Sequence, residues 1–274
     1  MSLLRRLPAG YAEWGEEGRR AAMSAAGAEL AAACAMVVMA KASLPGRVKT
    51  RLVPPLSPEQ AASLNTAFLR DAVDNLRAAG RLANVRSRIS YAPEGSEDFF
   101  RRAVPGIELV ETAATDFGAC LLHAVATALD AGYGSVCLLN ADTPTLPVGY
   151  LVAAATVLAD GTERAVLGPA TDGGYYLLGV RRAHRALFRD VAWSSERVFH
   201  QTMARAGELA LPVVTLPTWY DVDDVDGLRR LAGELLQGQA FRAVGREPTP
   251  ARHTRAWLQG LEATGDPAAV LWRN

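Results

Sequence analysis

Charged residues with a spacing suited to phosphate chemistry stand in the stretch PGRVKTRL. Arg47, Lys49 and Arg51 occupy every second position there, in a loop that follows an apolar run. Cationic donors set around a glycine can each meet a different oxygen of a diphosphate or triphosphate. The charge pattern alone is equally typical of a solvated basic loop. The three cations are therefore candidate phosphate ligands.

A second stretch, NADTP, ends an apolar run with a carboxylate, Asp142. Asn140 lies two residues earlier, so both side chains point to the same side of an extended chain. Hard divalent cations such as Mg²⁺ and Mn²⁺ take oxygen ligands, usually one or two carboxylates together with phosphate oxygens. Asp142 is thus a candidate metal ligand. The alternative is an Asx-turn, in which its side chain bonds its own backbone ahead of Pro144.

A third stretch, GPATDGGYYLLG, places Asp172 directly before Gly173 and Gly174. An Asp-Gly-Gly triplet between two apolar runs is a typical hairpin signal, because glycine readily adopts positive φ angles. The same residues would also let a ligand approach the backbone closely beside a carboxylate. Asp172 is therefore a candidate for positioning or deprotonating an acceptor hydroxyl.

A fourth stretch, WYDVDDVDGL, carries several acids close together near the end of an apolar run. Asp224 is a good N-cap for the helix that follows. Asp221 and Asp223 remain, and two neighbouring carboxylates repel each other unless a cation compensates them. A shared metal ion is the favoured interpretation, and an acidic surface turn is the alternative. Together, the four stretches predict one cleft for a phosphate group and a metal ion.

Apolar runs that alternate with helical patterns must position these stretches. Strands are expected at residues 35–40, 84–91, 107–111, 135–140, 164–168, 175–180 and within 211–217. Helices are expected from Ser57 to Gly80, from Asp116, at 148–159, at 195–206 and from Asp224. Gln60 completes a capping box with Ser57. This alternation predicts an α/β fold with a mostly parallel sheet flanked by helices, which binds ligands beyond the carboxyl ends of its strands.

Composition limits the class of protein. The 274 residues carry 29 basic and 29 acidic side chains, so no net field favours nucleic acid or an anionic membrane. The three cysteines lack C-x-x-C spacing and are expected to be reduced thiols in a cytoplasmic protein. Glu29 interrupts the alanine-rich stretch 21–40, which is a poor transmembrane candidate. The sequence contains no G-x-S-x-G, H-E-x-x-H or G-x-x-x-x-G-K-[ST] motif.

Three parts of the chain are expected. Residues 1–34 form a helical extension, 35–237 form the nucleotide-binding catalytic domain, and 238–274 form a proline-punctuated tail that packs on that domain. The oligomeric state and the role of the extension do not follow from the sequence.

Five ordered segments resemble a known family. AKASLPGRVKTRL, NADTPTLP, LGPATDGGYYLLGV, WSSERV and YDVDDVDGL resemble the GT-A-type arsenosugar-biosynthesis glycosyltransferases, which are related to 2-phospholactate and molybdenum-cofactor guanylyltransferases. The resemblance covers roughly residues 35–260. It implies a single GT-A domain, the Rossmann-like fold of nucleotide-diphospho-sugar transferases. It also implies a nucleotide sugar or nucleoside triphosphate bound through Mg²⁺ or Mn²⁺.

The resemblance also implies roles for individual residues. The basic loop, with Arg47, Lys49 and Arg51, would hold the phosphates. The metal would be bound by Asp142, Asp221 and Asp223. The sugar or acceptor pocket would be lined by Asp172, Gly173 and Gly174. Asp116 matches a further family position, with nucleotide binding implied and a plain helix N-cap as the alternative. Lys49 and Asp172 would be the catalytic residues.

The chain departs from the family in two places. Asn140-Ala141-Asp142 replaces a Gly-Ser-Asp or Gly-Cys-Asp, and TDFGACL has Cys120 where the family has an arginine. The favoured function is a metal-dependent glycosyltransferase that acts on a small-molecule acceptor. One alternative is a guanylyltransferase-like nucleotidyltransferase for a small phosphorylated substrate. The other, favoured by the missing arginine, is a catalytically inactive nucleotide-binding relative.

Overall fold

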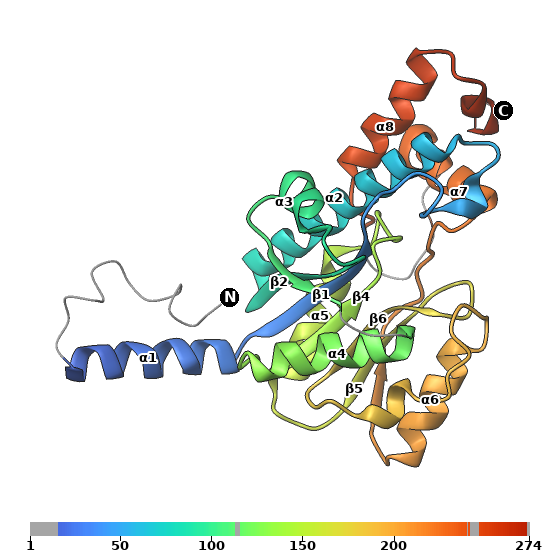
Figure 1. Cartoon of the computed structure of the whole chain (residues 1–274). Helices are drawn as coiled ribbons and strands as arrows, with labels where there is room; N and C mark the ends of the chain where they lie inside the picture. The colour runs from blue at the N-terminus through green and yellow to red at the C-terminus, as the bar shows by residue number, and fades with distance from the viewer. Residues whose placement is uncertain (1–15, 113–115, 240, 242–246, 273–274) are drawn as a thin grey trace.

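Seven strands form one mixed sheet in the computed structural model, which describes residues 16–112, 116–239, 241 and 247–272 (Figure 1). The strands are β1 (Cys34–Lys41), β2 (Val85–Ala92), β3 (Glu108–Glu111), β4 (Ser135–Leu139), β5 (Ala165–Pro169), β6 (Tyr175–Val180) and β7 (Val213–Thr215). Their order is β3-β2-β1-β4-β6-β5-β7, and of these strands β6 alone runs against its neighbours. This mostly parallel sheet confirms the predicted fold class.

One edge of the sheet collects the predicted site. Because all described strands except β6 run the same way, their carboxyl ends meet at that edge. The turn that joins β5 to the antiparallel β6 lies there too. The loops after β1, β4, β5 and β7 therefore converge, as expected of an α/β sheet that binds ligands beyond this edge.

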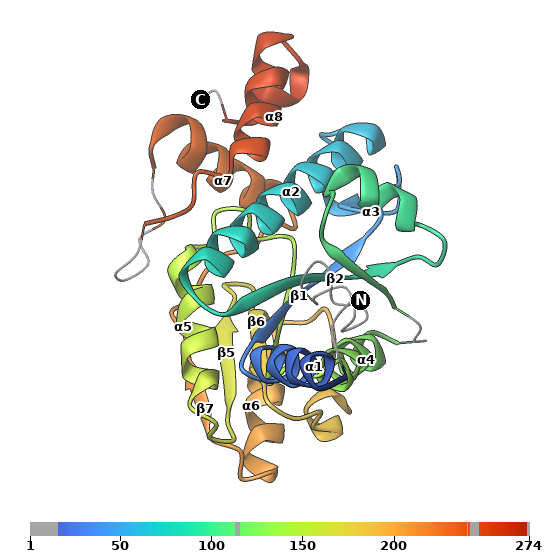
Figure 2. The same cartoon turned by 90° about the vertical axis from the view of Figure 1, so that its left-hand side faces the viewer.

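Helices cover both faces of the sheet (Figures 1 and 2). They are α1 (Glu16–Ala31), α2 (Pro58–Leu82), α3 (Glu97–Ala103), α4 (Phe117–Asp130), α5 (Val148–Ala159), α6 (Val198–Glu208), α7 (Val225–Gln237) and α8 (Arg252–Ala263). The core on one face contains side chains of α2, α5, α7 and α8, and the core on the other face contains side chains of α4 and α6.

The continuous apolar sequence of strand β1 follows from its position between two hydrophobic cores. Met36 and Val38 belong to the first core, whereas Ala35 and Val37 belong to the second. Successive side chains of a strand point to opposite faces. Since both faces of β1 are covered, all four residues are buried and polar alternation is absent.

Local sequence signals set several helix starts. The predicted capping box at α2 is confirmed: the Ser57 hydroxyl accepts from the Gln60 amide at 3.1 Å, and the Gln60 side chain accepts from the Ser57 amide at 2.7 Å. Asp224 caps α7 as predicted. The prediction that Gly80 ends α2 is wrong, because the helix continues to Leu82. A Cβ at Gly80 would lie 3.3 Å from the Val85 carbonyl, so the glycine lets β2 start close to the helix.

The segment after residue 246 docks firmly on α2. Asp71 of α2 accepts hydrogen bonds from the His253 amide at 2.9 Å and from the Thr254 amide at 2.8 Å. The Thr254 hydroxyl donates to the same carboxylate at 2.6 Å. Asp71 thereby caps the start of α8, a helix that the sequence does not signal locally. Thr254 and Leu258 are fully buried in this contact region.

The first and last parts of the chain are described in part. Residues 1–15, 240, 242–246 and 273–274 of the expected extension and tail lie outside the described residues. Helix α1 covers residues 16–31 of the expected extension and projects from the body (Figure 1), whereas Cys34, its last expected residue, already belongs to β1. In the described ranges, none of the helices combines the length and apolarity needed to cross a bilayer. The three cysteines are all reduced, and Cys34 and Cys137 are buried.

Candidate active site

The converging loops enclose a cleft of about 520 Å³ at the carboxyl edge of the sheet. Six of the ten predicted site residues line it: Arg47, Lys49, Arg51, Asp142, Asp172 and Asp223. Asp221 lies beside Asp172 and Asp223, while Gly173 and Gly174 form the turn behind Asp172. The structure thus brings together residues that are up to about 170 positions apart in the chain, in accordance with loop convergence at one sheet edge.

Lys49 lies at the centre of the acidic residues rather than facing open space. Its ammonium nitrogen is 2.6 Å from Asp142 Oδ1 and 2.9 Å from Asp223 Oδ1, and it donates to the Val222 carbonyl at 2.7 Å. Its side chain is only 5% exposed. Burial opposes the charged form, but the two carboxylates outweigh burial and raise the pKa of Lys49.

The three donors of the Lys49 ammonium are therefore used within the protein. An ammonium has three N–H groups, and the structure gives each a partner. Direct phosphate binding or catalysis by Lys49 stays a prediction, and it would require the side chain to give up one of these contacts. In the present geometry Lys49 acts as an internal counter-ion.

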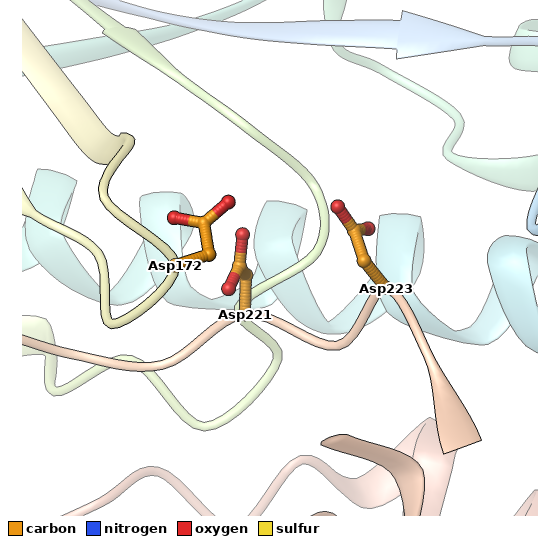
Figure 3. A group of neighbouring side chains, drawn as sticks. All are labelled: Asp172, Asp221 and Asp223. Atoms are coloured by element: carbon orange, nitrogen blue, oxygen red, sulfur yellow. The ribbon is translucent and has the colours of Figure 1, made fainter. Parts of the chain in front are cut away.

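Three carboxylates form an acidic cluster (Figure 3), and one of them, Asp223, contacts this lysine. Asp172, Asp221 and Asp223 each offer an oxygen, and these oxygens lie within 4.8 Å of one another. Burial, reinforced by the charges of Asp172 and Asp223, raises the pKa of Asp221 to about 7. Like charges this close are costly without a compensating cation. An all-oxygen set fits Mg²⁺ or Mn²⁺, so the residues present suit the implied metal.

Asp142 is attached to this cluster through Lys49. Its carboxylate bonds the lysine, so the interpretation of Asp142 as an Asx-turn does not describe its contact. In the part of the chain that the structure describes, the group of acids able to share one ion contains Asp172 and not Asp142. A ligand role for Asp142 stays a prediction.

Backbone hydrogen bonds tie the acidic segments to one another. The Thr171 amide donates to the Trp219 carbonyl at 3.0 Å, which joins the turn of Asp172 to the segment of Asp221. The Val222 amide donates to the Asp142 carbonyl at 3.0 Å, which joins that segment to the loop after β4. These bonds hold the carboxylates together despite their repulsion. Three loops that are distant in the sequence are thus held in one arrangement by main-chain hydrogen bonds.

The turn that carries Asp172 requires glycine. Gly173 has φ +89°, and a Cβ there would lie 2.2 Å from the Glu196 carbonyl oxygen. The Gly174 amide donates to Asp172 Oδ1 at 2.8 Å and fixes the carboxylate. The turn is a hairpin connection, as one interpretation of the sequence proposed, and it also presents Asp172 to the cleft. The two interpretations are compatible.

The basic loop supplies the opposite charge. Arg47 and Arg51 are exposed and line the cleft that Asp172 and Asp223 also line. Among the residues that the structure describes, no carboxylate pairs with either arginine. Both guanidinium groups remain available to an anion, for which their planar fork of donors is well suited.

A network of buried hydrogen bonds holds the segments that carry the acidic residues. The Tyr220 hydroxyl donates to Glu234 of α7 and accepts from the Thr145 hydroxyl at 3.1 Å. Tyr220 directly precedes Asp221, and Thr145 lies three residues after Asp142. Thr249 adds a second support, since its amide donates to the Thr145 carbonyl at 3.0 Å. Helix α7 and the C-terminal segment therefore both brace the site loops.

Asp116 lies at the N-terminus of α4, where its carboxylate accepts from the Ala119 amide at 2.9 Å. This is the N-cap interpretation of that residue. Of the described residues, its neighbours Phe117 and Cys120 line the cleft, whereas Asp116 does not. Nucleotide binding by Asp116 stays a prediction.

Sequence reasoning assigned no role to the loop around Trp193. Ser194, Ser195 and Glu196 line the cleft, and Ser194 has the unusual φ of +63°. The segment WSSERV was part of the family resemblance, which is the signal that could have marked it. Phe117 of α4, which contacts Trp193 edge-to-face, was also missed.

Part of the chain matches a known protein family. The family "Uncharacterized protein conserved in bacteria (DUF2064)" matches residues 63–195. That match includes Asp142 and Asp172 but not the basic loop or the acids near residue 222. No functionally curated protein matches the chain in sequence.

Solved structures give a broader match. A Desulfovibrio desulfuricans G20 protein, provisionally assigned as a nucleotide-diphospho-sugar transferase, is 27% identical with a TM-score of 0.72 over 87% of this chain and 97% of its own. A CMP:2-keto-3-deoxy-manno-octonic acid synthetase with CTP is 12% identical, with a TM-score of 0.49 over 75% and 99%. Mycobacterium tuberculosis H37Rv Rv0371c with manganese is 18% identical, with a TM-score of 0.45 over 73% and 97%.

The match to the Desulfovibrio desulfuricans protein establishes the fold of the chain and does not identify a substrate. The chain has the architecture of a nucleotide-diphospho-sugar transferase domain along nearly the whole length of the Desulfovibrio desulfuricans protein. The arsenosugar specificity that the sequence resemblance implied stays a prediction.

Proposed function

We propose that the chain, which shares its fold with a provisionally assigned nucleotide-diphospho-sugar transferase, is a glycosyltransferase dependent on a divalent cation. It would transfer the sugar of a nucleotide-sugar donor to the hydroxyl of a small-molecule acceptor. The observation that carries the proposal is the placement of unpaired Arg47 and Arg51 in the same cleft as the acidic cluster. Cationic donors and clustered carboxylates are what a metal-bound diphosphate needs.

The donor would be held by both kinds of charge. Arg47 and Arg51 would donate hydrogen bonds to the diphosphate oxygens. Asp221 and Asp223 would hold the cation, and Lys49 keeps Asp223 in place through its 2.9 Å contact. Asp142 bonds Lys49 through Oδ1, so its second carboxylate oxygen would be the one to join the ligand set. When bound, a divalent cation supplies charge neutralisation on the leaving diphosphate.

Asp172 would serve the acceptor. It is the exposed member of the acidic cluster, and its Oδ1 is already fixed by the Gly174 amide. As the acceptor oxygen forms its bond to the anomeric carbon, the bond from that carbon to the diphosphate oxygen breaks. The electron pair leaves with the diphosphate, where Arg47 and Arg51 stabilise the charge. The acceptor proton passes to the Asp172 carboxylate.

A panel of nucleotides tests the proposal. We expect UDP, GDP or a nucleotide sugar to raise the Tm of the full chain in the presence of Mn²⁺, and to do so less in EDTA. We also expect slow Mn²⁺-dependent release of nucleoside diphosphate from one nucleotide sugar. Asp223→Asn should remove both effects, whereas Asp226→Asn should leave them intact, because Asp226 is an exposed acid on α7 that pairs with Arg229.

Other outcomes select the alternative functions. Pyrophosphate release from a nucleoside triphosphate, only when a phosphorylated acceptor is present, would show a nucleotidyltransferase. Mn²⁺-dependent nucleotide binding without turnover of any donor would show a non-catalytic relative. Either result would overturn glycosyl transfer.

A further inference from the structure

A second cavity of about 180 Å³ opens beside the cleft. The two spaces share part of their lining, including Asp172, Phe117 and Ser195. Beyond these shared residues, the second cavity is lined mostly by apolar and aromatic side chains, among them Leu121, Tyr175, Trp193 and Val198. We call this space the annex. Its position makes Asp172 the junction between a charged cleft and an apolar recess.

An exposed aromatic side chain stands at the annex. Phe117 is 50% exposed, which is unusual for a phenylalanine at the first turn of a helix that packs on the sheet. Its ring meets that of Trp193 edge-to-face, with centroids 5.3 Å apart at 80°. The pair thus forms a wall of the annex while part of the Phe117 ring faces solvent. An exposed apolar surface beside a cleft is typical of a ligand contact.

Close packing fixes the wall that Phe117 and Trp193 form. A Cβ at Gly118 would lie 2.5 Å from the Phe188 carbonyl oxygen and 2.9 Å from Trp193 Nε1, so the tryptophan sits directly against the backbone of α4. The Ser195 hydroxyl donates to the Ala192 carbonyl at 2.6 Å and holds the loop that carries Trp193. The annex is therefore a preformed recess.

The charge of the annex excludes the phosphate end of a donor. Among the described residues that line the annex, Asp172 is the one charged side chain, and its charge is negative. The arginines and Lys49 line the larger cleft instead. A diphosphate would thus lie toward the basic loop. A neutral, apolar group suits the annex, and it would lie next to the carboxylate proposed to receive the acceptor proton.

We propose that the annex binds an apolar, ring-sized group of the acceptor and thereby delivers the acceptor hydroxyl to Asp172. This inference rests on the proposed glycosyl transfer and names the class of acceptor: an alcohol whose hydroxyl is attached to, or one carbon from, an apolar ring. The size agrees, because an apolar cavity of about 150 Å³ holds a benzene molecule. Tyr175 adds an aromatic side chain to the lining of the annex.

Ligand-observed saturation-transfer NMR on the full chain tests binding without any nucleotide. Benzyl alcohol and glycerol are the probes, since both carry a primary hydroxyl and only the first carries a ring. We expect at least a fivefold stronger signal from benzyl alcohol. Phe117→Asp should reduce that signal at least fivefold. Leu82→Asp is the matched control, because Leu82 is 70% exposed on α2 and lies outside the annex, and it should leave the signal unchanged.

A second variant makes the test independent of Phe117. Trp193→Ala should enlarge the annex, so the signal from 2-naphthylmethanol should be at least fivefold stronger in this variant than in the wild type. Equal signals from benzyl alcohol and glycerol would overturn the proposal, and so would unchanged benzyl alcohol binding in Phe117→Asp together with no gain in Trp193→Ala.

Transfer to the acceptor is measured separately. With a nucleotide sugar that the enzyme hydrolyses and with Mn²⁺, benzyl alcohol should raise nucleoside diphosphate release at least threefold, and glycerol should not. Hydrolysis that neither alcohol accelerates would overturn the acceptor role of the annex. Absence of any Mn²⁺-dependent nucleotide response would instead overturn the proposed function, because annex binding is read without nucleotide. The two failures are therefore distinguishable.

Discussion

Replacing Lys49 with methionine is the sharpest test of how the acidic residues are held together. Methionine keeps a side chain of similar length but removes the charge that Asp142 and Asp223 share. The substitution also leaves the Val222 carbonyl without its 2.7 Å donor. Two carboxylates would then face each other with no cation between them. We expect a large loss of stability in EDTA.

The magnitude follows from burial and exposure. Removing one partner of a fully buried ion pair costs about 3–5 kcal/mol. The Asp142 and Asp223 side chains are 30% and 42% exposed, so water screens part of the charge that is left behind. We therefore expect the free energy of unfolding to fall by about 2–3 kcal/mol. At about 2–4 °C per kcal/mol, Tm should fall by about 4–12 °C.

Urea unfolding with and without Mn²⁺ measures this effect. Mn²⁺ at a hundred times its Kd should stabilise the variant by about 2.7 kcal/mol, because it binds the folded state and not the unfolded chain. The double variant Lys49→Met/Asp142→Asn should be more stable than Lys49→Met alone. Arg51→Met is the control: it changes an exposed cation of the same loop and should cost less than about 0.5 kcal/mol. A loss below 1 kcal/mol for Lys49→Met, with no recovery in the double variant, would refute the reasoning.

Three further predictions concern single residues. Mn²⁺ affinity should rise about tenfold from pH 6 to pH 8 in the wild type, because a carboxyl with a pKa of about 7 must lose its proton to bind metal; isothermal titration should show a flatter profile for Asp221→Asn. Gly173→Ala should cost at least about 2 kcal/mol in urea unfolding, since a positive φ and a contact at 2.2 Å act together. Burial raises the pKa of Glu234, so the folded state binds its proton more tightly and stability falls as pH rises through the folded pKa. Unfolding at several pH values should therefore show Glu234→Gln gaining on the wild type as pH rises above the unfolded value.

Each of these has a control or a contrary result. A Mn²⁺ affinity that does not change between pH 6 and pH 8 would contradict the proton linkage at Asp221. Gly265→Ala is the matched control for Gly173→Ala, because Gly265 also has a positive φ (+65°) but has open space around its Cβ position; equal losses in the two variants would show that the contact with the Glu196 carbonyl costs nothing. A stability difference between Glu234→Gln and the wild type that is constant with pH would remove Glu234 from the titrating groups.

Much of the fold could be predicted because its signals are local. Ser57 with Gln60, and Asp224 before Gly227, cap helices within one turn, and their residue types state this directly. The start of α8 could not be predicted, because its cap is Asp71, which lies more than 180 residues earlier. Gly80 was wrongly predicted to end α2 for a related reason. This glycine lets the start of β2 approach the helix closely, and the sequence of the helix does not reveal that contact.

The site was predictable to the level of which segments meet. The apolar periodicity predicts the succession of strands and helices along the chain. In the mostly parallel sheet that this succession indicates, the ends of β1, β4, β5 and β7 lie at one edge. The pairing of individual charges was not predictable. That Lys49 would bond Asp142, while Asp172 joined Asp221 and Asp223, depends on side-chain directions set by the Thr171–Trp219 and Val222–Asp142 backbone bonds. The annex depends on the conformation of the loop that carries Trp193; the WSSERV resemblance could have marked this loop but does not give its conformation.

The bracing of the loop after β4 has a consequence for synthesis on the ribosome. The Thr249 hydroxyl bonds the Pro144 carbonyl, 105 residues earlier in the chain, and α8 begins shortly after that contact. The nascent polypeptide therefore carries Asp142 on an incompletely supported loop until this late segment has left the exit tunnel. The loop that carries Asp142 thus gains its full set of contacts only after residue 249 has been synthesised, and not when the acids themselves emerge.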